Sequence, residues 1–211
     1  MRIKSVFWAN FFTGLRLVLS LSIFSLLAFG KRFEAYVAQG NWQPVRTYWG
    51  IVFGLFLVAW ATDLLDGLAA RMAQVESAWG RVADPLVDKI LICGTFVFLL
   101  PLNAGVSAWM VLVILGREVL VSVLRSIAEH RGISFEARPE GKIKMTAQLL
   151  TLGFIILLKG SYPEKFLDGR PIFLMLLLYL TIAITLASGI SYVWRFVKVF
   201  PRPAAGKSER D

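Results

Sequence analysis

Six long apolar runs alternate with short polar stretches along the whole chain. A helix that crosses a membrane needs about 20 mainly apolar residues, and most of the runs approach that length. We therefore predict six transmembrane helices, at Val6–Phe29, Tyr48–Ala70, Pro85–Leu100, Ser107–Ala128, Ile143–Lys159 and Pro171–Val197. The third run is short, and the second and fourth contain charged residues. The pattern favours an all-α membrane protein built as one bundle of six transmembrane helices.

Composition agrees with this pattern. Of the 211 residues, 57% are hydrophobic and 18% are charged, whereas soluble domains are about 45–50% apolar and about 25% charged. The length leaves no room for a separate soluble domain. We expect a single transmembrane domain over residues 1–200, followed by a polar cytoplasmic tail over residues 201–211.

The basic residues predict an orientation. Six helices place both termini on one side, together with the loops Arg71–Asp84 and Glu129–Lys142. That side collects 17 of the 23 lysines and arginines when charges inside helices are assigned to the nearer end. Cytoplasmic loops carry an excess of Lys and Arg, so this side is expected to be cytoplasmic. The net charge of +9 then reflects orientation and contact with anionic lipids, and nucleic-acid binding is not expected.

Four aspartates near the cytoplasmic ends of two neighbouring helices form the strongest chemical signal: Asp63, Asp66, Asp84 and Asp88. Asp63 and Asp66 are three residues apart, which puts them on one helix face. Pro85 suits the first position of a helix, so Asp84 is expected to be an N-cap and Asp88 to lie one turn further on. The thirteen-residue connection that this implies would let the two pairs converge.

Carboxylates crowded in a poorly hydrated place need compensating cations. Oxygen ligands of this kind suit Mg²⁺, Mn²⁺ or Ca²⁺, and pairs of metal ions that share carboxylates are common in phosphoryl chemistry. The alternative is a solvated network with Arg71, Arg81 and Lys89. Because acids inside apolar spans are usually functional, we favour a metal site.

The same region carries a longer motif, D-x-x-D-G-x-x-A-R-x(8)-G-x-x-x-D-x-x-x-D, which resembles the signature of the CDP-alcohol phosphatidyltransferase family. All eight fixed positions match, at Asp63, Asp66, Gly67, Ala70, Arg71, Gly80, Asp84 and Asp88. The resemblance implies six transmembrane helices around a cytoplasm-facing active-site cavity. It implies transfer of a phosphatidyl or related group from a CDP-linked donor to a hydroxyl, with release of CMP.

The resemblance also implies roles for these residues. Asp63, Asp66 and Asp84 would hold two divalent ions, Mg²⁺ or Mn²⁺. Asp88 would share the metal and act as the catalytic base on the acceptor hydroxyl. The CDP donor would lie along Gly67, Ala70, Arg71 and Gly80.

Near the N-terminus, Asn10, Thr13 and Arg16 share one helix face. The sequence Asn10-Phe11-Phe12-Thr13-Gly14-Leu15-Arg16 resembles the N-x-x-T-x-x-R opening of the phosphatidylglycerophosphate synthase branch of the family, which implies donor binding. An arginine in an apolar span needs an anionic partner, here a nucleotide phosphate or a site carboxylate. Snorkelling of Arg16 to the membrane surface is the alternative.

A third stretch resembles the R-E-x…R and G-K-x-K-T-x-x-Q elements of the same branch, with Met145 standing before Thr146. Its basic residues could converge from two helix ends on one phosphate dianion. They are Arg117, Arg125, Lys142 and Lys144. Decoration of a cytoplasmic loop with positive charge is the alternative for Arg125 and Lys144. The resemblance covers residues 5–150, and the last helix shows little beyond hydrophobicity.

The function implied is transfer of a phosphatidyl group from CDP-diacylglycerol to glycerol 3-phosphate, by a homodimer in a bacterial inner membrane. One alternative is a cardiolipin synthase that uses phosphatidylglycerol as the acceptor, and an inositol-phosphate acceptor comes next. A different class is a divalent-cation transporter. A transporter would place its acids near the membrane midplane, whereas these acids gather at one end of one helix pair.

Overall fold

A computed structural model describes the backbone of residues 2–73, 78–131, 139–166 and 171–199. Within those ranges the side chains of residues 2–10, 38, 63–73, 78–85 and 139–140 lie outside the description. The predicted tail over residues 201–211 also lies outside it.

The described part of the chain is entirely helical. Its elements are α1 (Arg2–Phe29), α2 (Lys31–Ala38), α3 (Trp42–Ala73), α4 (Ala78–Leu99), the 3-10 turn η1 (Leu100–Leu102), α5 (Ala108–His130), α6 (Pro139–Ser161), the 3-10 turn η2 (Pro163–Phe166) and α7 (Ile172–Val199).

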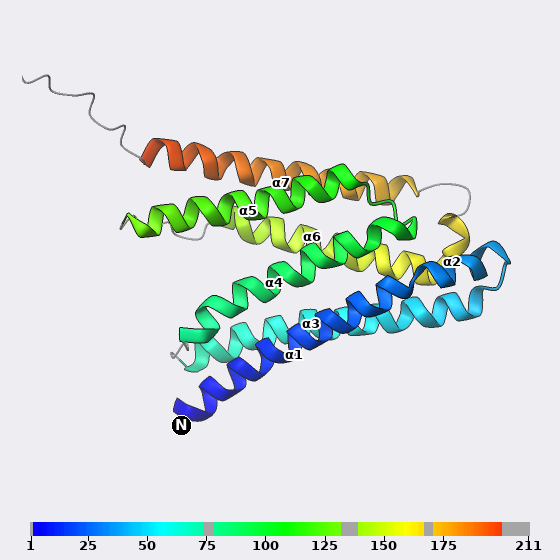
Figure 1. Cartoon of the computed structure of the whole chain (residues 1–211), viewed down its shortest axis with the longest axis horizontal. Coiled ribbons are helices and arrows are strands. Elements are labelled where there is room, and N and C mark those ends of the chain that lie inside the picture. Colours follow the sequence, from blue (N-terminus) through cyan, green and yellow to red (C-terminus); the bar gives the residue numbers. More distant parts are fainter. Residues whose placement is uncertain (1, 74–77, 132–138, 167–170, 200–211) are drawn as a thin grey trace, which may run out of the picture.

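The long helices form two groups of three (Figure 1). Helix α1 packs against α3 and α4, while α7 packs against α5 and α6, and contacts between α3 and α6 join the two groups. The start of α1 and the end of α7 lie at the same end of the molecule, where the two groups diverge. The short elements α2, η1 and η2 lie at the opposite end, where the groups are close together.

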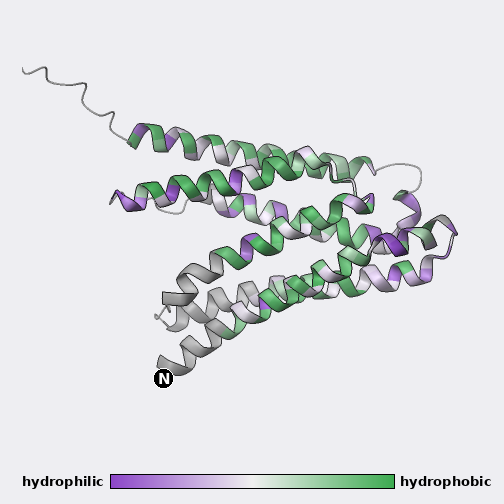
Figure 2. Cartoon of the chain, viewed as in Figure 1, coloured by the Kyte–Doolittle hydropathy of each residue, from purple (hydrophilic) through white to green (hydrophobic). Residues whose placement is uncertain are grey.

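Each of the six predicted spans coincides with one long helix. By length and composition, four helical segments of the described chain can cross a membrane: Phe11–Phe29, Trp42–Thr62, Gly141–Ser161 and Ile172–Val199. Helix α5 carries Arg117, Glu118 and Arg125 within its apolar sequence. Figure 2 shows these helices as mainly hydrophobic, with hydrophilic positions gathered near their ends and at a few interior sites.

The structure corrects two details of the predicted helix boundaries. Helix α4 begins at Ala78, so Asp84 is not an N-cap and Pro85 lies inside the helix. Only residues 74–77 separate α3 from α4, in place of the thirteen-residue connection. The prediction gave the missing N–H of proline too much weight, because membrane helices tolerate an interior proline when neighbouring groups satisfy the freed carbonyl.

Small residues set how closely the helices approach one another. A Cβ atom added to Gly94 of α4 would lie 2.1 Å from Cζ of Phe24 on α1, so a side chain at this position would displace the ring. That ring also stacks on Phe98, with centroids 5.1 Å apart. Packing of backbones over small residues is a general source of stability where lipid removes the hydrophobic driving force between helices.

A buried ion pair fastens α2, which the hydrophobic pattern did not predict, to the end of α6. Lys159 is only 2% exposed, and its Nζ atom lies 2.6 Å from Oε1 of Glu34 on α2. The same ammonium lies over the rings of Phe166 and Trp49, 4.9 and 5.7 Å from their centroids. Removing one partner of such a pair leaves an uncompensated buried charge. This contact therefore holds α2 against α6 at the end of the bundle where the two groups of helices are close together.

Candidate functional site

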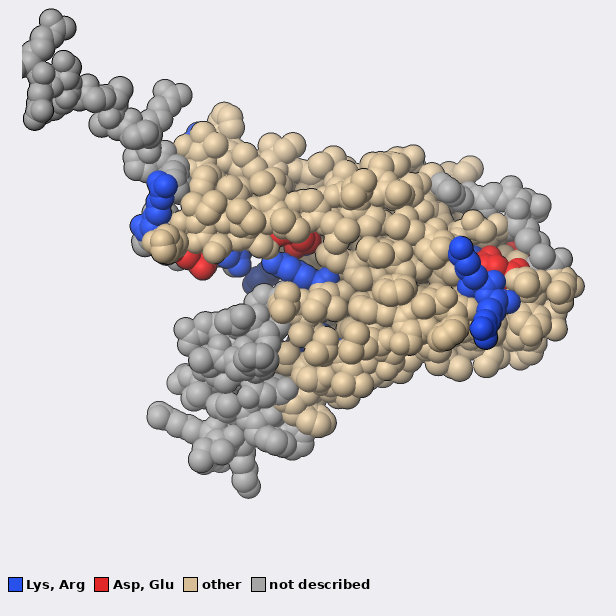
Figure 3. All heavy atoms as spheres, viewed as in Figure 1, with Lys and Arg blue, Asp and Glu red and all other residues tan. Residues whose placement is uncertain are grey.

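A cavity of about 230 Å³ lies between the two groups of helices, where the space-filling view shows a hollow (Figure 3). Residues of α4, α5, α6 and α7 line it. Figure 3 shows basic and acidic side chains in this hollow, and further charged side chains near the two ends of the molecule. The cavity therefore combines parts of the chain that are far apart in the sequence.

The cavity brings together all four basic residues that were predicted to bind an acceptor phosphate, and it adds Lys89. Five basic and two acidic side chains line it: Lys89, Arg117, Arg125, Lys142, Lys144, Asp88 and Glu118. The basic majority makes the cavity suited to an anion, and charge-assisted hydrogen bonds from Arg and Lys are the strong contacts to phosphate.

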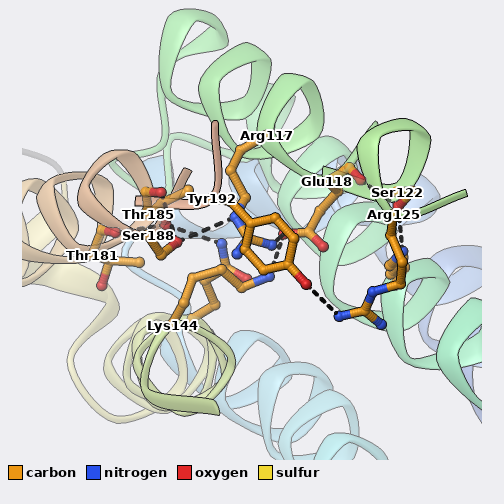
Figure 4. Close-up of polar contacts among 11 residues, drawn as sticks. Arg117, Glu118, Ser122, Arg125, Lys144, Thr181, Thr185, Ser188 and Tyr192 are labelled. Atoms are coloured by element: carbon orange, nitrogen blue, oxygen red, sulfur yellow. Dashed lines mark hydrogen bonds and ion pairs between the residues drawn. The ribbon is translucent and has the colours of Figure 1, made fainter. Parts of the chain in front are cut away.

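Helix α5 supplies three of these charges from one face. Arg117 and Glu118 are followed by Val121 one turn on and by Arg125 after a second turn. Residues three to four positions apart on a helix lie above one another, so the helix presents its charges as a column. The close-up in Figure 4 shows this column facing Lys144 of α6 and Tyr192 of α7.

Glu118 links the cations on two helices. Its side chain forms an ion pair with Lys144 and lies 3.3 Å from Nη1 of Arg117. Glu118 is 8% exposed and Lys144 is 6% exposed, so the three charges compensate one another away from bulk water. Buried charges are retained where they are paired in this way.

A short hydrogen-bond chain continues from Glu118 to α4. Nζ of Lys89 donates to Oγ of Ser122 at 2.5 Å, and that hydroxyl donates to the main-chain oxygen of Glu118 at 2.5 Å. Lys89 directly follows Asp88, so this chain fixes the adjacent part of α4 against α5.

Helix α7 holds the arginines of α5 in place. Nη2 of Arg125 donates to the hydroxyl of Tyr192 at 2.9 Å, and Nε of Arg117 donates to Oγ of Ser188 at 3.2 Å. Both contacts are drawn in Figure 4. A guanidinium that is already oriented loses less conformational freedom when it binds a phosphate, so α7 prepares the cavity for an anion.

Asp88 and Arg16 meet across α4 and α1. Nη1 of Arg16 donates to Oδ1 of Asp88 in an ion pair, and Arg16 is only 1% exposed. An anionic partner of Arg16 in the structure is the carboxylate of Asp88. Its burial excludes snorkelling in this arrangement. Thr13, one turn earlier on α1, is also buried.

The remaining residues of the predicted aspartate motif lie on α3 and α4, and their side chains are outside the described residues. They are Asp63, Asp66, Gly67, Ala70, Arg71, Gly80 and Asp84. The side chain of Asn10 is outside the description for the same reason. No cluster of three or more metal-binding residues occurs among the side chains that are described, a set that contains only Asp88 of the four aspartates.

Besides Lys89, the polar lining residues Glu118, Gln148 and Tyr192 were given no role in the predicted site. An acidic residue inside an apolar span is a functional signal by itself, so Glu118 could have been found. Tyr192 belongs to a polar stripe on α7, formed with Thr181, Thr185 and Ser188. Spacings of four, three and four residues place that stripe on one helix face.

A comparison with protein families matches nearly the whole chain. The sequence model of the family described as CDP-alcohol phosphatidyltransferase matches residues 6–194. The match spans both the aspartate motif and the residues of the cavity.

The chain is also similar to individual curated proteins. "CDP-diacylglycerol--glycerol-3-phosphate 3-phosphatidyltransferase" of Bacillus subtilis is 33% identical over 138 residues, which cover 65% of this chain and 69% of the relative. The protein of the same name from Treponema pallidum is 29% identical over 204 residues, covering 92% of this chain and 91% of the relative. "Probable phosphatidylglycerophosphate synthase" of Mycobacterium tuberculosis is 29% identical over 191 residues, covering 90% and 81%.

Proposed function

The chain belongs to the CDP-alcohol phosphatidyltransferase family, and on this premise we propose that it is a phosphatidylglycerophosphate synthase. It transfers a phosphatidyl group from CDP-diacylglycerol to glycerol 3-phosphate and releases CMP. The names of its relatives support this assignment. The observation that carries it is the cavity in which Arg117, Arg125, Lys142 and Lys144 converge near Asp88.

The basic residues form the acceptor end of the site. Glycerol 3-phosphate brings a dianion, and several cations from α5 and α6 line the same cavity. Lys142 is exposed and has no ion pair with any described residue. It can therefore meet the incoming phosphate first. Arg117 and Lys144 are already paired with Glu118, so the phosphate would share these cations with that carboxylate.

The donor end lies toward α1, α3 and the start of α4. Asn10, Thr13 and Arg16 of α1, with Gly67, Ala70, Arg71 and Gly80, form the proposed surface for the CDP group. Thr13 and Arg16 are buried where α1 packs on its neighbours. Glycines and alanines leave room for a nucleotide close to the backbone, and the acyl chains of the donor remain in lipid.

The four aspartates form the proposed metal site, and the helix boundaries favour their convergence. Asp63 lies ten residues before the end of α3, and Asp88 lies ten residues after the start of α4. At 1.5 Å per residue both are about 15 Å from the short connection. Asp66 and Asp84 are seven and six residues from it. Because only four residues join the two helices, Asp63 and Asp88 lie at one distance from the connection, and Asp66 and Asp84 lie together at a shorter one.

This set of oxygen donors fits two hard divalent ions, Mg²⁺ or Mn²⁺, held by Asp63, Asp66, Asp84 and Asp88. Bound there, such ions would neutralise the diphosphate of the donor and stabilise the departing CMP.

Asp88 is the proposed base. It takes the proton of the acceptor hydroxyl as that oxygen forms a bond to the phosphorus of the phosphatidyl group, and the bond between this phosphorus and the CMP oxygen breaks. A base must lie within hydrogen-bond reach of the proton that it accepts. Asp88 lines the acceptor cavity, and its carboxylate forms an ion pair with Arg16.

The proposed topology has six transmembrane helices in one domain over residues 1–200, with both termini and the cavity on the cytoplasmic side. In this topology α4 and α5 cross the membrane together with the four helices whose length and composition allow them to do so. The bundle lies in the bacterial inner membrane, as a homodimer. Light scattering of the protein in nanodiscs measures that stoichiometry.

An acceptor screen tests the proposed function. Purified protein with CDP-diacylglycerol and Mg²⁺ or Mn²⁺ is given glycerol 3-phosphate, phosphatidylglycerol, inositol 1-phosphate or serine, and CMP release and lipid products are measured. We expect product with glycerol 3-phosphate. Product with phosphatidylglycerol alone would make the protein a cardiolipin synthase. Metal uptake into vesicles without CMP release would make it a transporter.

A further inference from the structure

A buried side-chain amide lies beside the charged residues of the cavity. Gln148 of α6 lines the cavity and is 0% exposed. Its Nε2 atom donates a hydrogen bond to Oγ1 of Thr185 on α7 at 3.1 Å. Its Oε1 atom is buried and has no hydrogen-bond partner among the described residues.

The hydroxyl of Thr185 on α7 determines the orientation of the Gln148 amide. The hydroxyl of Thr185 donates its single proton to the main-chain oxygen of Thr181 at 2.7 Å. It can therefore only accept from Gln148. A rotated amide would place Oε1 against a hydroxyl oxygen with no proton to offer, so Nε2 must face Thr185. The orientation leaves Oε1 as a buried hydrogen-bond acceptor on a residue that lines the cavity.

A buried acceptor without a partner is costly, and native proteins rarely keep one without a reason. The neighbouring cations Lys144 and Arg117 are engaged with Glu118, and Arg125 is engaged with Tyr192. A small molecule that enters the cavity could supply the missing donor. A hydroxyl group of the substrate meets this need.

We propose that Oε1 of Gln148 accepts a hydrogen bond from the acceptor hydroxyl that does not react, which makes Gln148 a specificity-determining residue. The inference rests on the proposed function. Glycerol 3-phosphate has a phosphate at one end, the reacting hydroxyl at the other and a second hydroxyl between them. The cations, Asp88 and Gln148 line one cavity, so one small molecule can meet all three.

The experiment compares two acceptors in two proteins. The first acceptor is glycerol 3-phosphate, and the second is 3-hydroxypropyl phosphate, which lacks only the middle hydroxyl. Wild-type protein is expected to favour the first in kcat/KM by roughly 5- to 150-fold, the range for leaving a buried polar group unpaired. Gln148→Met keeps the length of the side chain without the oxygen, and it should abolish this preference by lowering turnover of glycerol 3-phosphate alone.

Two further variants separate recognition from packing. Thr185→Val frees the amide to rotate and should reduce the preference while Gln148 remains. Thr151→Val is the matched control. Thr151 hydrogen-bonds to Thr181 at 2.6 Å across the same α6–α7 interface, but it does not line the cavity. This variant should keep the full preference.

Several results would overturn the inference. Equal losses with both acceptors in Gln148→Met would give the amide a structural role only. A wild-type protein that uses both acceptors equally would leave the proposed function intact and remove the role of Gln148. A wild-type protein that turns over neither acceptor would remove the proposed function itself, and the inference with it.

Discussion

Asp88 both lines the acceptor cavity and forms an ion pair with the buried Arg16. A group that is both base and metal ligand should respond differently from a ligand alone. We predict that Asp88→Asn lowers kcat by about 10²–10⁴-fold, the usual loss for a general base. Binding of CDP-diacylglycerol should remain, since three carboxylates are left. Parallel measurement of kcat and donor affinity checks this.

The pH dependence of the rate gives a second readout for Asp88. The acidic limb of the wild-type profile should be flattened in Asp88→Asn. A melting curve is needed beside it, because the substitution also removes a charge that compensates Arg16. If the affinity for CDP-diacylglycerol falls together with kcat, Asp88 acts only as a metal ligand and not as the base.

The basic residues of the cavity should affect one substrate more than the other. We predict that Arg117→Ala or Lys142→Ala raises the KM for glycerol 3-phosphate by roughly 10- to 150-fold, since a hydrogen bond to a charged group contributes about 1.5–3 kcal/mol. The KM for CDP-diacylglycerol should change little. Lys198→Ala is the control, because Lys198 is an exposed cation outside the cavity. Equal effects on both substrates would place Arg117 and Lys142 elsewhere in the mechanism.

At the scale of elements, α3 and α4 carry the proposed metal site between them. We predict that Asp63→Asn, Asp66→Asn or Asp84→Asn each abolishes transfer while the helical content and the melting temperature persist. Activity is measured while Mg²⁺ or Mn²⁺ is titrated into each variant. Glu129→Gln, an exposed site on α5, is the control. Full activity in one aspartate variant would remove that residue from the site.

Helix α7 shows how an element with little sequence signal can serve the site. Its sequence is strongly apolar, yet Ser188 and Tyr192 hold the two arginines of α5. Thr181 and Thr185 meet Thr151 and Gln148 of α6. Polar residues between membrane helices hydrogen-bond across the interface because lipid offers no alternative partner. The helix therefore orients binding groups without itself carrying a charge in the cavity.

At the scale of the whole molecule, the proposed orientation places the end where the helix groups diverge in the cytoplasm. We predict that, in a Cys93→Ala background, Gln39→Cys reacts with a membrane-impermeant maleimide in intact spheroplasts. Glu129→Cys should react only after the membrane is permeabilised. Both positions are exposed and lie at opposite ends of the bundle. The reverse pattern would invert the topology.

The hydrophobic pattern located each of the six long helices in the described part of the chain, because about twenty apolar residues favour a helix wherever water is absent. It missed α2, since that helix is short and is held to α6 through Glu34 and Lys159. It also placed the start of α4 seven residues late. The cost of a proline in a helix depends on what surrounds it, and the sequence does not state those surroundings.

The sequence by itself determined the family of the chain, whose sequence model matches residues 6–194, and it supplied the candidate aspartates and basic residues. Only the tertiary structure decided how these groups are paired. Arg16 met Asp88, Glu118 came between Arg117 and Lys144, and Gln148 was fixed by Thr185. Apart from the adjacent Arg117 and Glu118, these partners are between 26 and 72 residues apart. Spacing along a helix specifies which residues share a face, but the packing of separate helices selects the partner that each face meets.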